Sequence, residues 1–495
     1  MSMMDATELV REIAARRISA TEAVSACLKT VAALNPALNA ICTLTAESAL
    51  AAAKDCERRL ASGLPPRALE GVPFVAKDNL QTKGVRTTYG ALPYADNVPT
   101  EDAICVERMK AAGAILLGKT NTPEFASDVT TNNRLFGATR NPWNPACTAG
   151  GSSGGSGAAV AAGMAPLGLG TDLGGSIRVP ASFNGLVGLR TAPGRVPVYP
   201  ADFAWDTLVE HVHGPLTRSV QDAGLMLGVL AGEDDRAPNS LPGPVQDYVR
   251  AASGKVPLTG RRVAYSANLN GLAPVDPEVE ALTRSAATHF IRLGCSVEEA
   301  CPDLADLRSI MAGTRAFGMI GRFAGYLESS RAQMTEQLIR QVSDALRVDA
   351  RSIANAERAR SAYYQRVRLF LQDYDYLLCP TVGAPPFRLD QPLPAELGGK
   401  PVDRFYDVFL FTYAFSVTGL PSISVPCGFT RAGLPVGLQI VSRRLREDLV
   451  LEAASAYLRD CPQHLRQPQP DAASLRDLAP VHASLGGGAD WIRED

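Results

Sequence analysis

The sequence predicts an α/β protein whose β-sheet carries helices on both faces. From Gly71 onward, short apolar runs such as residues 72–76 and 114–117 alternate with helical stretches such as residues 103–112. A second strand–helix series extends from Arg262 to about Ala456, and residues 334–374 form a long helical block within it. Hydrophobic residues make up 46% and charged residues 20% of the 495-residue chain, so it can bury a sizeable core.

The first 65 residues read as helical. Ser19 and Glu22 have the spacing of a capping box, and apolar residues then recur at helical spacing until Asn35-Pro36, where we expect the helix to end. A second helix is expected over residues 46–61.

No composition shift or clean linker separates independent domains, so we expect one domain with three parts. Residues 1–67 form an N-terminal helical layer packed on the same domain, and residues 68–466 form the α/β core. Residues 467–495 are polar, contain three consecutive glycines at 486–488, and are expected to form a loosely held C-terminal tail.

Charge and cysteine usage limit the class of partner and the compartment. The net charge of −2 provides no field that would gather nucleic acid or an anionic membrane surface. The start of the chain lacks the apolar core of a secretory signal, and no apolar stretch is long enough to span a bilayer. Ten scattered cysteines without a C-x-x-C pair indicate reduced, mostly buried thiols. We therefore expect a cytoplasmic protein that binds neither nucleic acid nor membranes.

Three local patterns resemble known motifs but do not support their chemistry. Residues 113–120 fit the P-loop expression, yet the residues that should cradle a phosphate are Ala-Ile-Leu-Leu, which predicts a strand. Residues 150–154 fit the G-x-S-x-G nucleophile elbow, which needs a later histidine as base. The downstream candidates lack an obvious acid–histidine setting: His289, His464 and His482. His211 and His213 have no third metal ligand nearby and read better as alternating positions on a short strand.

The segments 148–163 and 169–178 are the informative ones. They are rich in glycine and serine, but residues 157–163 are small and apolar, which predicts a buried helix packed on a sheet and argues against a solvated linker. Glycines let main-chain amides approach a substrate closely, so the run Leu173-Gly174-Gly175-Ser176 can aim successive N–H groups at one spot, as an oxyanion hole requires. Ser176 beside that hole is a candidate nucleophile.

A serine nucleophile needs a base, and Lys77 is the next candidate after the histidines. Lys77 follows the apolar run 72–76. Burial would favour its neutral amine, which can accept a proton. A lysine at the end of a strand beside Asp78 is equally well explained as a surface charge, so the local sequence leaves both readings open.

Taken together, these segments resemble the amidase signature family of serine amidohydrolases. The residues around Lys77, the GGSSGG run at 150–155 and the GTDLGGSIR run at 170–178 carry the resemblance, and Lys77, Ser152 and Ser176 have the family's spacing. Further segments also look like family segments: residues 141–144, 185–190, 214–218, 419–427 and 433–439. The similarity covers residues 5–460, and it implies a large mixed, mostly parallel β-sheet enclosed by α-helices.

The resemblance also implies roles for individual residues. Ser176 resembles the acylated nucleophile, Lys77 the base, and Ser152 the serine that relays the proton between them. The peptide bond between Gly151 and Ser152 is expected to be cis. The resemblance assigns the oxyanion-hole amides to Leu173, Gly174, Gly175 and Ser176, and supporting hydrogen bonds to Ser153, Asp172 and Arg178. No metal or organic cofactor is expected, and the substrate is a small-molecule amide.

Within this family the sequence is most similar to stand-alone amidases of broad range, acting on linear, aryl or cyclic amides. The main alternative is the glutaminase component of a tRNA-dependent amidotransferase, whose segment after the nucleophile differs clearly from residues 196–208 here. A catalytically silent binding protein is disfavoured because all three relay residues are present. The resemblance also suggests a homodimer. Four apolar residues can line a substrate pocket, although each reads equally as core: Phe125, Trp205, Phe317 and Met319.

Overall fold

The fold is built on one large mixed sheet, seen in a computed structural model that describes residues 3–205, 211–243, 245–391, 393–402, 405–461 and 466–469. The sheet has the strand order β1-β3-β2-β4-β6-β5-β12-β13-β9-β7-β8. Its strands are β1 Ile41–Leu44, β2 Pro73–Lys77, β3 Ile115–Thr120, β4 Leu167–Asp172, β5 Val187–Arg190, β6 Val212–Thr217, β7 Arg262–Tyr265, β8 Ser296–Glu299, β9 Tyr376–Pro380, β12 Ser422–Phe429 and β13 Pro435–Val441. A separate hairpin pairs β10 Glu396–Leu397 with β11 Lys400–Pro401.

The expectation of a mixed sheet is confirmed, but the expectation that it is mostly parallel is wrong. Parallel pairing is confined to β3-β2-β4 near one end and β9-β7-β8 at the other. The six remaining neighbouring pairs are antiparallel. The pair β12–β13 in the middle of the sheet is antiparallel because a short turn joins these two strands, which makes them run in opposite directions.

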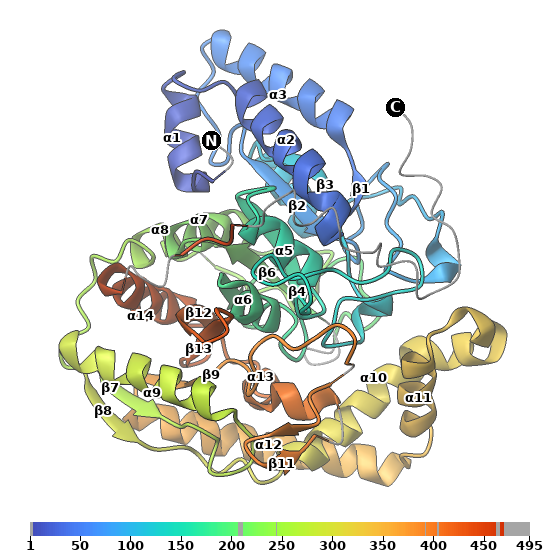
Figure 1. The fold of residues 1–495 in the computed structure, drawn as a ribbon, viewed down its shortest axis with the longest axis vertical. Coiled ribbons are helices and arrows are strands. Elements are labelled where there is room, and N and C mark those ends of the chain that lie inside the picture. The colour runs from blue at the N-terminus through green and yellow to red at the C-terminus, as the bar shows by residue number, and fades with distance from the viewer. Residues whose placement is uncertain are drawn as a thin grey trace.

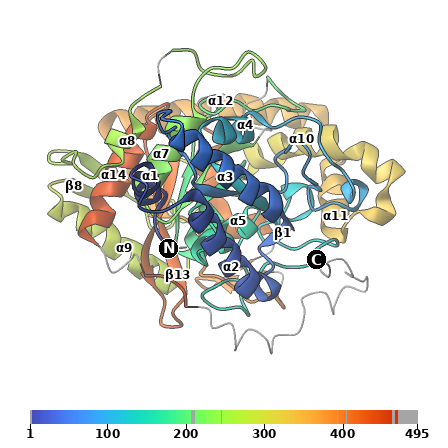
Figure 2. The ribbon, with the colours of Figure 1, turned by 90° about the horizontal axis from the view of Figure 1, so that it is seen from above.

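Helices enclose the sheet (Figure 1). They are α1 Ala6–Ala14, α2 Ala20–Leu38, α3 Ala46–Ala61, α4 Ile104–Ala111, α5 Gly154–Ala161, α6 Arg178–Asn184, α7 Val220–Leu230, α8 Tyr248–Ala251, α9 Pro277–Arg292, α10 Leu307–Ser329, α11 Glu336–Ala345, α12 Ala350–Asp373, α13 Leu410–Ser416 and α14 Glu447–Asp460. The largest hydrophobic core joins the sheet to α1–α5, α7–α9 and α14. A second core joins it to α6, α10, α12 and α13. Figure 2, seen from above, shows α2 and α3 over α5.

The N-terminal segment matches its prediction with two corrections. The capping box of Ser19 and Glu22 opens α2, and α3 covers the predicted range. However, Ile41–Leu44 is not helical: it forms the edge strand β1 against β3. Helix α2 also continues past Pro36 to Leu38, because a proline so near the end of a helix removes little hydrogen bonding. The boundaries at 67 and 466 remain a prediction, and residues 470–495 of the expected tail lie outside the described part of the chain.

The helix α5 brings the glycine-rich segment against the sheet. All eight of its residues are buried, as the small apolar pattern predicts. At Gly155 a Cβ atom would lie 2.4 Å from the backbone nitrogen of Asn121. Glycine is therefore required for the helix to lie this close to the end of β3, and this close packing fixes the loop that precedes α5.

Candidate active site

The predicted relay residues meet at one edge of the sheet. Lys77 ends β2, and Asp172 ends β4, its parallel neighbour, so both strand ends lie at the same edge. Ser152 lies in the loop that leads into α5, and Ser176 lies in the turn between β4 and α6. Residues that are far apart in the chain are thus brought together by strand pairing and by the two short helices.

Lys77 is a buried amine that contacts two hydroxyl groups. Its Nζ atom lies 2.6 Å from Oγ of Ser152 and 2.9 Å from Oγ1 of Thr171. All three side chains are inaccessible to solvent. Burial lowers the pKa of Lys77 well below its ordinary value, and the charge of Asp172 opposes this only in part. The reading of Lys77 as a surface charge is therefore wrong, and its amine is suited to accept a proton.

The loop around Ser152 is held in place by its neighbours. The peptide bond between Gly151 and Ser152 is cis, which confirms the expectation from the family resemblance. Thr131 bridges the two ends of the loop: its hydroxyl donates to the carbonyl of Gly150 over 2.8 Å and accepts the N–H of Gly154 over 3.1 Å. The position of the Ser152 hydroxyl is thus set by backbone contacts on both sides.

Ser153 ties this loop to the candidate nucleophile. Its backbone N–H donates to the carbonyl of Ser176 over 3.1 Å. Its hydroxyl lies 3.3 Å from both the N–H and the carbonyl oxygen of Thr171. Ser153 therefore links the end of β4 to the turn that carries Ser176.

A buried ion-pair network shapes that turn. Arg178 donates to the Asp172 carboxylate from Nε over 3.0 Å and from Nη2 over 2.9 Å, and Arg190 also contacts it. Burial alone would raise the pKa of Asp172, but the charges of Arg178 and Arg190 outweigh it and hold that pKa below its usual range. The carboxylate also accepts the N–H groups of Gly175 over 2.8 Å and Ile177 over 3.1 Å. Asp172 is thus an ionised anchor for the turn that presents Ser176.

The turn forms part of the wall of a large pocket with a volume of about 950 Å³. Leu173, Gly174, Gly175 and Ser176 all line it, and Ser176 is partly exposed there, whereas Ser152 and Lys77 are fully buried. A substrate in the pocket can therefore reach Ser176 directly, while the lysine remains shielded from water.

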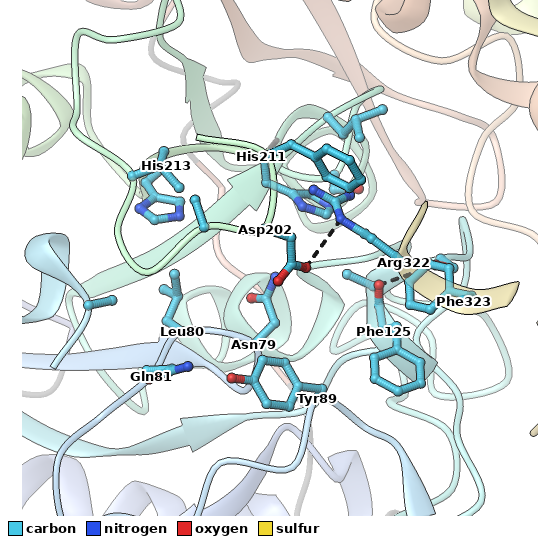
Figure 3. A pocket seen from close by; sticks show the side chains of 18 of the residues that line it. Asn79, Leu80, Gln81, Tyr89, Phe125, Asp202, His211, His213, Arg322 and Phe323 are labelled. Atoms are coloured by element: carbon cyan, nitrogen blue, oxygen red, sulfur yellow. Dashed lines mark hydrogen bonds and ion pairs between the residues drawn. The ribbon is translucent and has the colours of Figure 1, made fainter. Parts of the chain in front are cut away.

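Aromatic side chains form another part of the pocket wall. The ring of Phe125 lies 5.0 Å from that of Phe323 and 5.5 Å from that of Tyr326, and Tyr89 and Tyr94 are adjacent. Figure 3 shows Tyr89, Phe125 and Phe323 of this group near the ion pair between Asp202 and Arg322, whose charged atoms are 3.6 Å apart. The pocket thus combines an apolar wall with a charged pair.

Of the four apolar residues predicted to line a pocket, two do so. Phe125 and Met319 line it. Trp205 is 80% exposed, and Phe317 packs against Phe203 with 42% of its surface exposed, so neither belongs to the wall. Residues 206–208, which complete the segment compared with amidotransferases, lie outside the described residues.

Sequence reasoning missed several residues that contact the relay or the pocket. Thr171 and Thr131 make the hydrogen bonds given above, and Asn79 donates from Nδ2 to Thr171 Oγ1 over 3.1 Å. His213 lies on β6, as the strand reading predicts, whereas His211 precedes that strand, so the reading is wrong for it. Both histidines also line the pocket. Asn79 lies in the turn that follows β2, where the two-residue alternation of a strand no longer applies, so the sequence carried no signal for its role.

The segments with rejected motifs have the following structures. Residues 115–120 form β3 and no phosphate loop. The expectation that His289 lacks an acid partner is wrong, because its Nε2 atom lies 2.5 Å from Oδ2 of Asp460, but neither residue lines the pocket that holds Ser176. His464 and His482 lie outside the described residues. Within the described ranges, no group of three histidine, cysteine or acidic side chains could hold a metal ion, and no helix is long and apolar enough to cross a membrane. The cysteines that the structure describes are all free, eight of them buried.

Comparisons with known proteins identify the family. The family model for amidases matches residues 22–451. The chain is 38% identical to an acylamidase from Rhodococcus erythropolis, over 92% of this chain and 94% of that protein. It is 36% identical to the A-type component of the glutamyl-tRNA(Gln) amidotransferase from Thermosynechococcus vestitus, over 93% of this chain and 99% of that protein. The structure of a bacterial aryl acylamidase of the amidase signature family superposes with a TM-score of 0.86 at 29% identity, covering 93% of this chain and 97% of that one. The chain belongs to the amidase signature family and is an amide hydrolase.

Proposed function

We propose that this protein is a stand-alone amidase that hydrolyses small-molecule carboxylic amides through an acyl-enzyme on Ser176. The observation that carries the proposal is the 2.6 Å contact between the fully buried Lys77 Nζ and Ser152 Oγ, in a loop whose next residue donates to the carbonyl of the partly exposed Ser176. A neutral amine that is hydrogen-bonded to a hydroxyl group can accept a proton through it, and this pair can activate a serine nucleophile in place of a histidine.

In the first step the Oγ atom of Ser176 attacks the carbonyl carbon of the amide. Its proton passes to Ser152, and the proton of Ser152 passes to Lys77. The negative charge that develops on the carbonyl oxygen is stabilised by backbone N–H groups of the turn. We assign this role to Leu173, Gly174 and Ser176, because the N–H of Gly175 already donates to Asp172.

In the second step the carbon–nitrogen bond breaks. The ammonium group of Lys77 returns its proton through Ser152 to the leaving nitrogen, because an amine is a poor leaving group unless it is protonated. The acyl group remains on Ser176 as an ester. Water then attacks this ester with Lys77 and Ser152 again acting as the base, and the carboxylic acid is released.

The shape and lining of the pocket favour a substrate with an apolar acyl group. The aromatic wall around Phe125 offers van der Waals contact to an alkyl or aryl chain. The similarity to the amidotransferase component leaves glutamine hydrolysis for a partner protein as the second candidate.

The test is the release of ammonia or amine from a panel of aliphatic, aryl and anilide amides and from glutamine. Wild-type protein should release product from simple amides without any partner, and Ser176→Ala should abolish the release. Ser152→Ala should retain a small residual activity, about 10² to 10⁴-fold below wild type, because it removes proton relay and leaves the nucleophile. Equal activity of Ser176→Ala and wild type would refute the acyl-enzyme, and release from glutamine alone would favour the amidotransferase component.

A further inference from the structure

The turn that carries Ser176 contains two consecutive glycines, which have no side chains to fix their conformation. Glycine adopts a wider range of backbone dihedral angles than any other residue, so the peptide bond between Gly174 and Gly175 can turn in several directions. The N–H groups of Gly174 and Ser176, which we assign to the oxyanion hole, lie on the two peptide bonds that flank it. The direction of the central peptide bond therefore constrains where both donors point.

Contacts from outside the two glycines hold this peptide bond on both sides. The N–H of Gly175 donates to Oδ1 of Asp172 over 2.8 Å. The hydroxyl of Thr412 donates to the carbonyl oxygen of Gly174 over 2.7 Å. Among the residues that the structure describes, no other group donates to that carbonyl. The orientation of the peptide bond thus depends on one carboxylate and on one hydroxyl that comes from far along the chain.

Helix α13 also packs directly on the glycines. A Cβ atom at Gly175 would lie 2.3 Å from Oγ1 of Thr412, and one at Gly174 would lie 2.6 Å from the ring of Tyr413. Gly175 has a φ of +140°, which other residues rarely adopt. Two consecutive residues of the helix therefore lie against two consecutive residues of the turn, at a distance that only glycine permits.

Thr412 is itself held in place and is closed to the substrate. It lies within α13 and is fully buried. Its carbonyl accepts Nη1 of Arg178 over 2.9 Å, and its hydroxyl hydrogen is shared with the carbonyl of Phe409, 2.8 Å away on the preceding turn of the helix. Thr412 does not line the pocket, so it can affect a substrate only through the turn.

We propose that Thr412 is a positioning residue for the oxyanion hole, whose hydroxyl fixes the Gly174–Gly175 peptide bond and so keeps the flanking N–H groups directed at one point. The inference rests on the proposed acyl-enzyme mechanism, because an oxyanion forms only when Ser176 attacks the substrate. Preorganised donors act on charge that develops in the transition state, so loss of this hydroxyl should lower kcat and leave KM nearly unchanged.

The experiment measures kcat and KM for an amide that the wild-type protein hydrolyses. Thr412→Val keeps the branched shape and removes the hydroxyl, so kcat should fall about 10- to 100-fold with KM within about twofold of wild type. Thr412→Ala removes the hydroxyl without placing a methyl group against the carbonyl, and it should show the same loss. Thr412→Ser retains the hydroxyl and should keep kcat within about threefold of wild type.

Thr418 provides the matched control, since it is a buried threonine two residues beyond the end of α13. Its hydroxyl donates to the carbonyl three residues earlier, that of Phe415, over 2.6 Å, as the hydroxyl of Thr412 does to Phe409. Within the described residues, no hydrogen bond joins Thr418 to the turn. Thr418→Val should therefore keep the wild-type kcat.

A transition-state analogue tests the oxyanion hole separately from turnover. With a trifluoromethyl ketone that carries the acyl group of the substrate, Oγ of Ser176 adds to the carbonyl carbon, its proton passes through Ser152 to Lys77, and the ketone oxygen becomes an oxyanion. The inhibition constant of this ketone should rise in Thr412→Val by about the factor by which kcat/KM falls. The inhibition constant of the carboxylic acid product should not change.

The outcomes separate this inference from the proposed function. A wild-type kcat in Thr412→Val and Thr412→Ala, an equal loss in Thr412→Ser, or an unchanged inhibition constant of the ketone would each overturn the positioning role. An equal loss in Thr418→Val would also overturn it, since any buried hydroxyl of this segment would then matter as much. Retained amide hydrolysis by Ser176→Ala would instead overturn the acyl-enzyme, whatever the effect at Thr412.

Discussion

Oδ1 of Asp172 lies 2.9 Å from Nη2 of Arg178, and neither side chain is accessible to solvent. Arg178 also donates to the carbonyl of Thr412, to Gln439 and to Ser416. The pair thus joins the turn that carries Ser176 to helix α13 and strand β13.

Arg178→Met should destabilise the fold strongly. Removing one partner of a buried ion pair leaves the Asp172 carboxylate short of hydrogen bonds, which costs about 3–5 kcal/mol. Urea unfolding measures the loss. Arg17→Met removes an exposed ion pair with Glu12, so this variant should unfold at the same urea concentration as wild type. Equal midpoints for the two variants would show that the buried pair contributes nothing to stability.

The pH dependence should report Lys77. The lysine acts as base only when neutral, so kcat/KM should rise with pH along one limb. Because burial lowers its pKa, this limb should lie well below 10.5. A pH profile with chemistry shown to be limiting is the measurement, and a flat profile from mildly acidic to alkaline pH would contradict the assignment.

Lys119 is the necessary control for that profile. It is also buried, and burial lowers its pKa to about 8, but its Nζ atom contacts Thr87 and the carbonyl of Leu80 and not the relay. Lys119→Met should therefore retain the limb. Loss of the limb in this variant would reassign the titration from Lys77 to Lys119.

Thr131→Val should slow catalysis more than it weakens binding. Valine keeps the shape of threonine and removes both hydrogen bonds that bracket the Ser152 loop. We expect a fall of about tenfold in kcat with little change in KM, and a stability loss of about 1–2 kcal/mol. Steady-state kinetics together with thermal unfolding separate the two effects. A stability loss without any change in kcat would mean that the threonine supports only the fold.

Phe125→Ala should weaken the binding of aryl substrates. Truncating this ring removes the centre of the aromatic wall, so KM for an aryl amide should rise about tenfold, with a smaller effect on acetamide. Phe317→Ala is the matched control, because this ring lies outside the wall. If both variants raise KM alike, the wall around Phe125 does not bind the acyl group.

The sequence predicted the parts of this site that are encoded locally. The glycine and serine segments, the apolar strand before Lys77 and the small residues of α5 each restrict the backbone within a few positions, so their pattern is readable. The contacts of Thr131 and His213 depend on which segments pack together, and a threonine in an irregular loop or a histidine on a strand carries no such signal. The excess of antiparallel pairs and the strand Ile41–Leu44 were missed for the same reason: pairing partners are far apart in the chain.

The pocket is assembled from two sources that are separate in the chain. Lys77, Ser152 and Ser176 come from strand ends and turns in the N-terminal part of the chain, whereas Arg315, Met319, Phe323 and Tyr326 come from helix α10. The residues that contact the acyl group and those that cleave the bond can therefore be varied separately. Exchanging residues 315–326 for those of another amidase should change the acyl preference and leave the mechanism of bond cleavage unchanged.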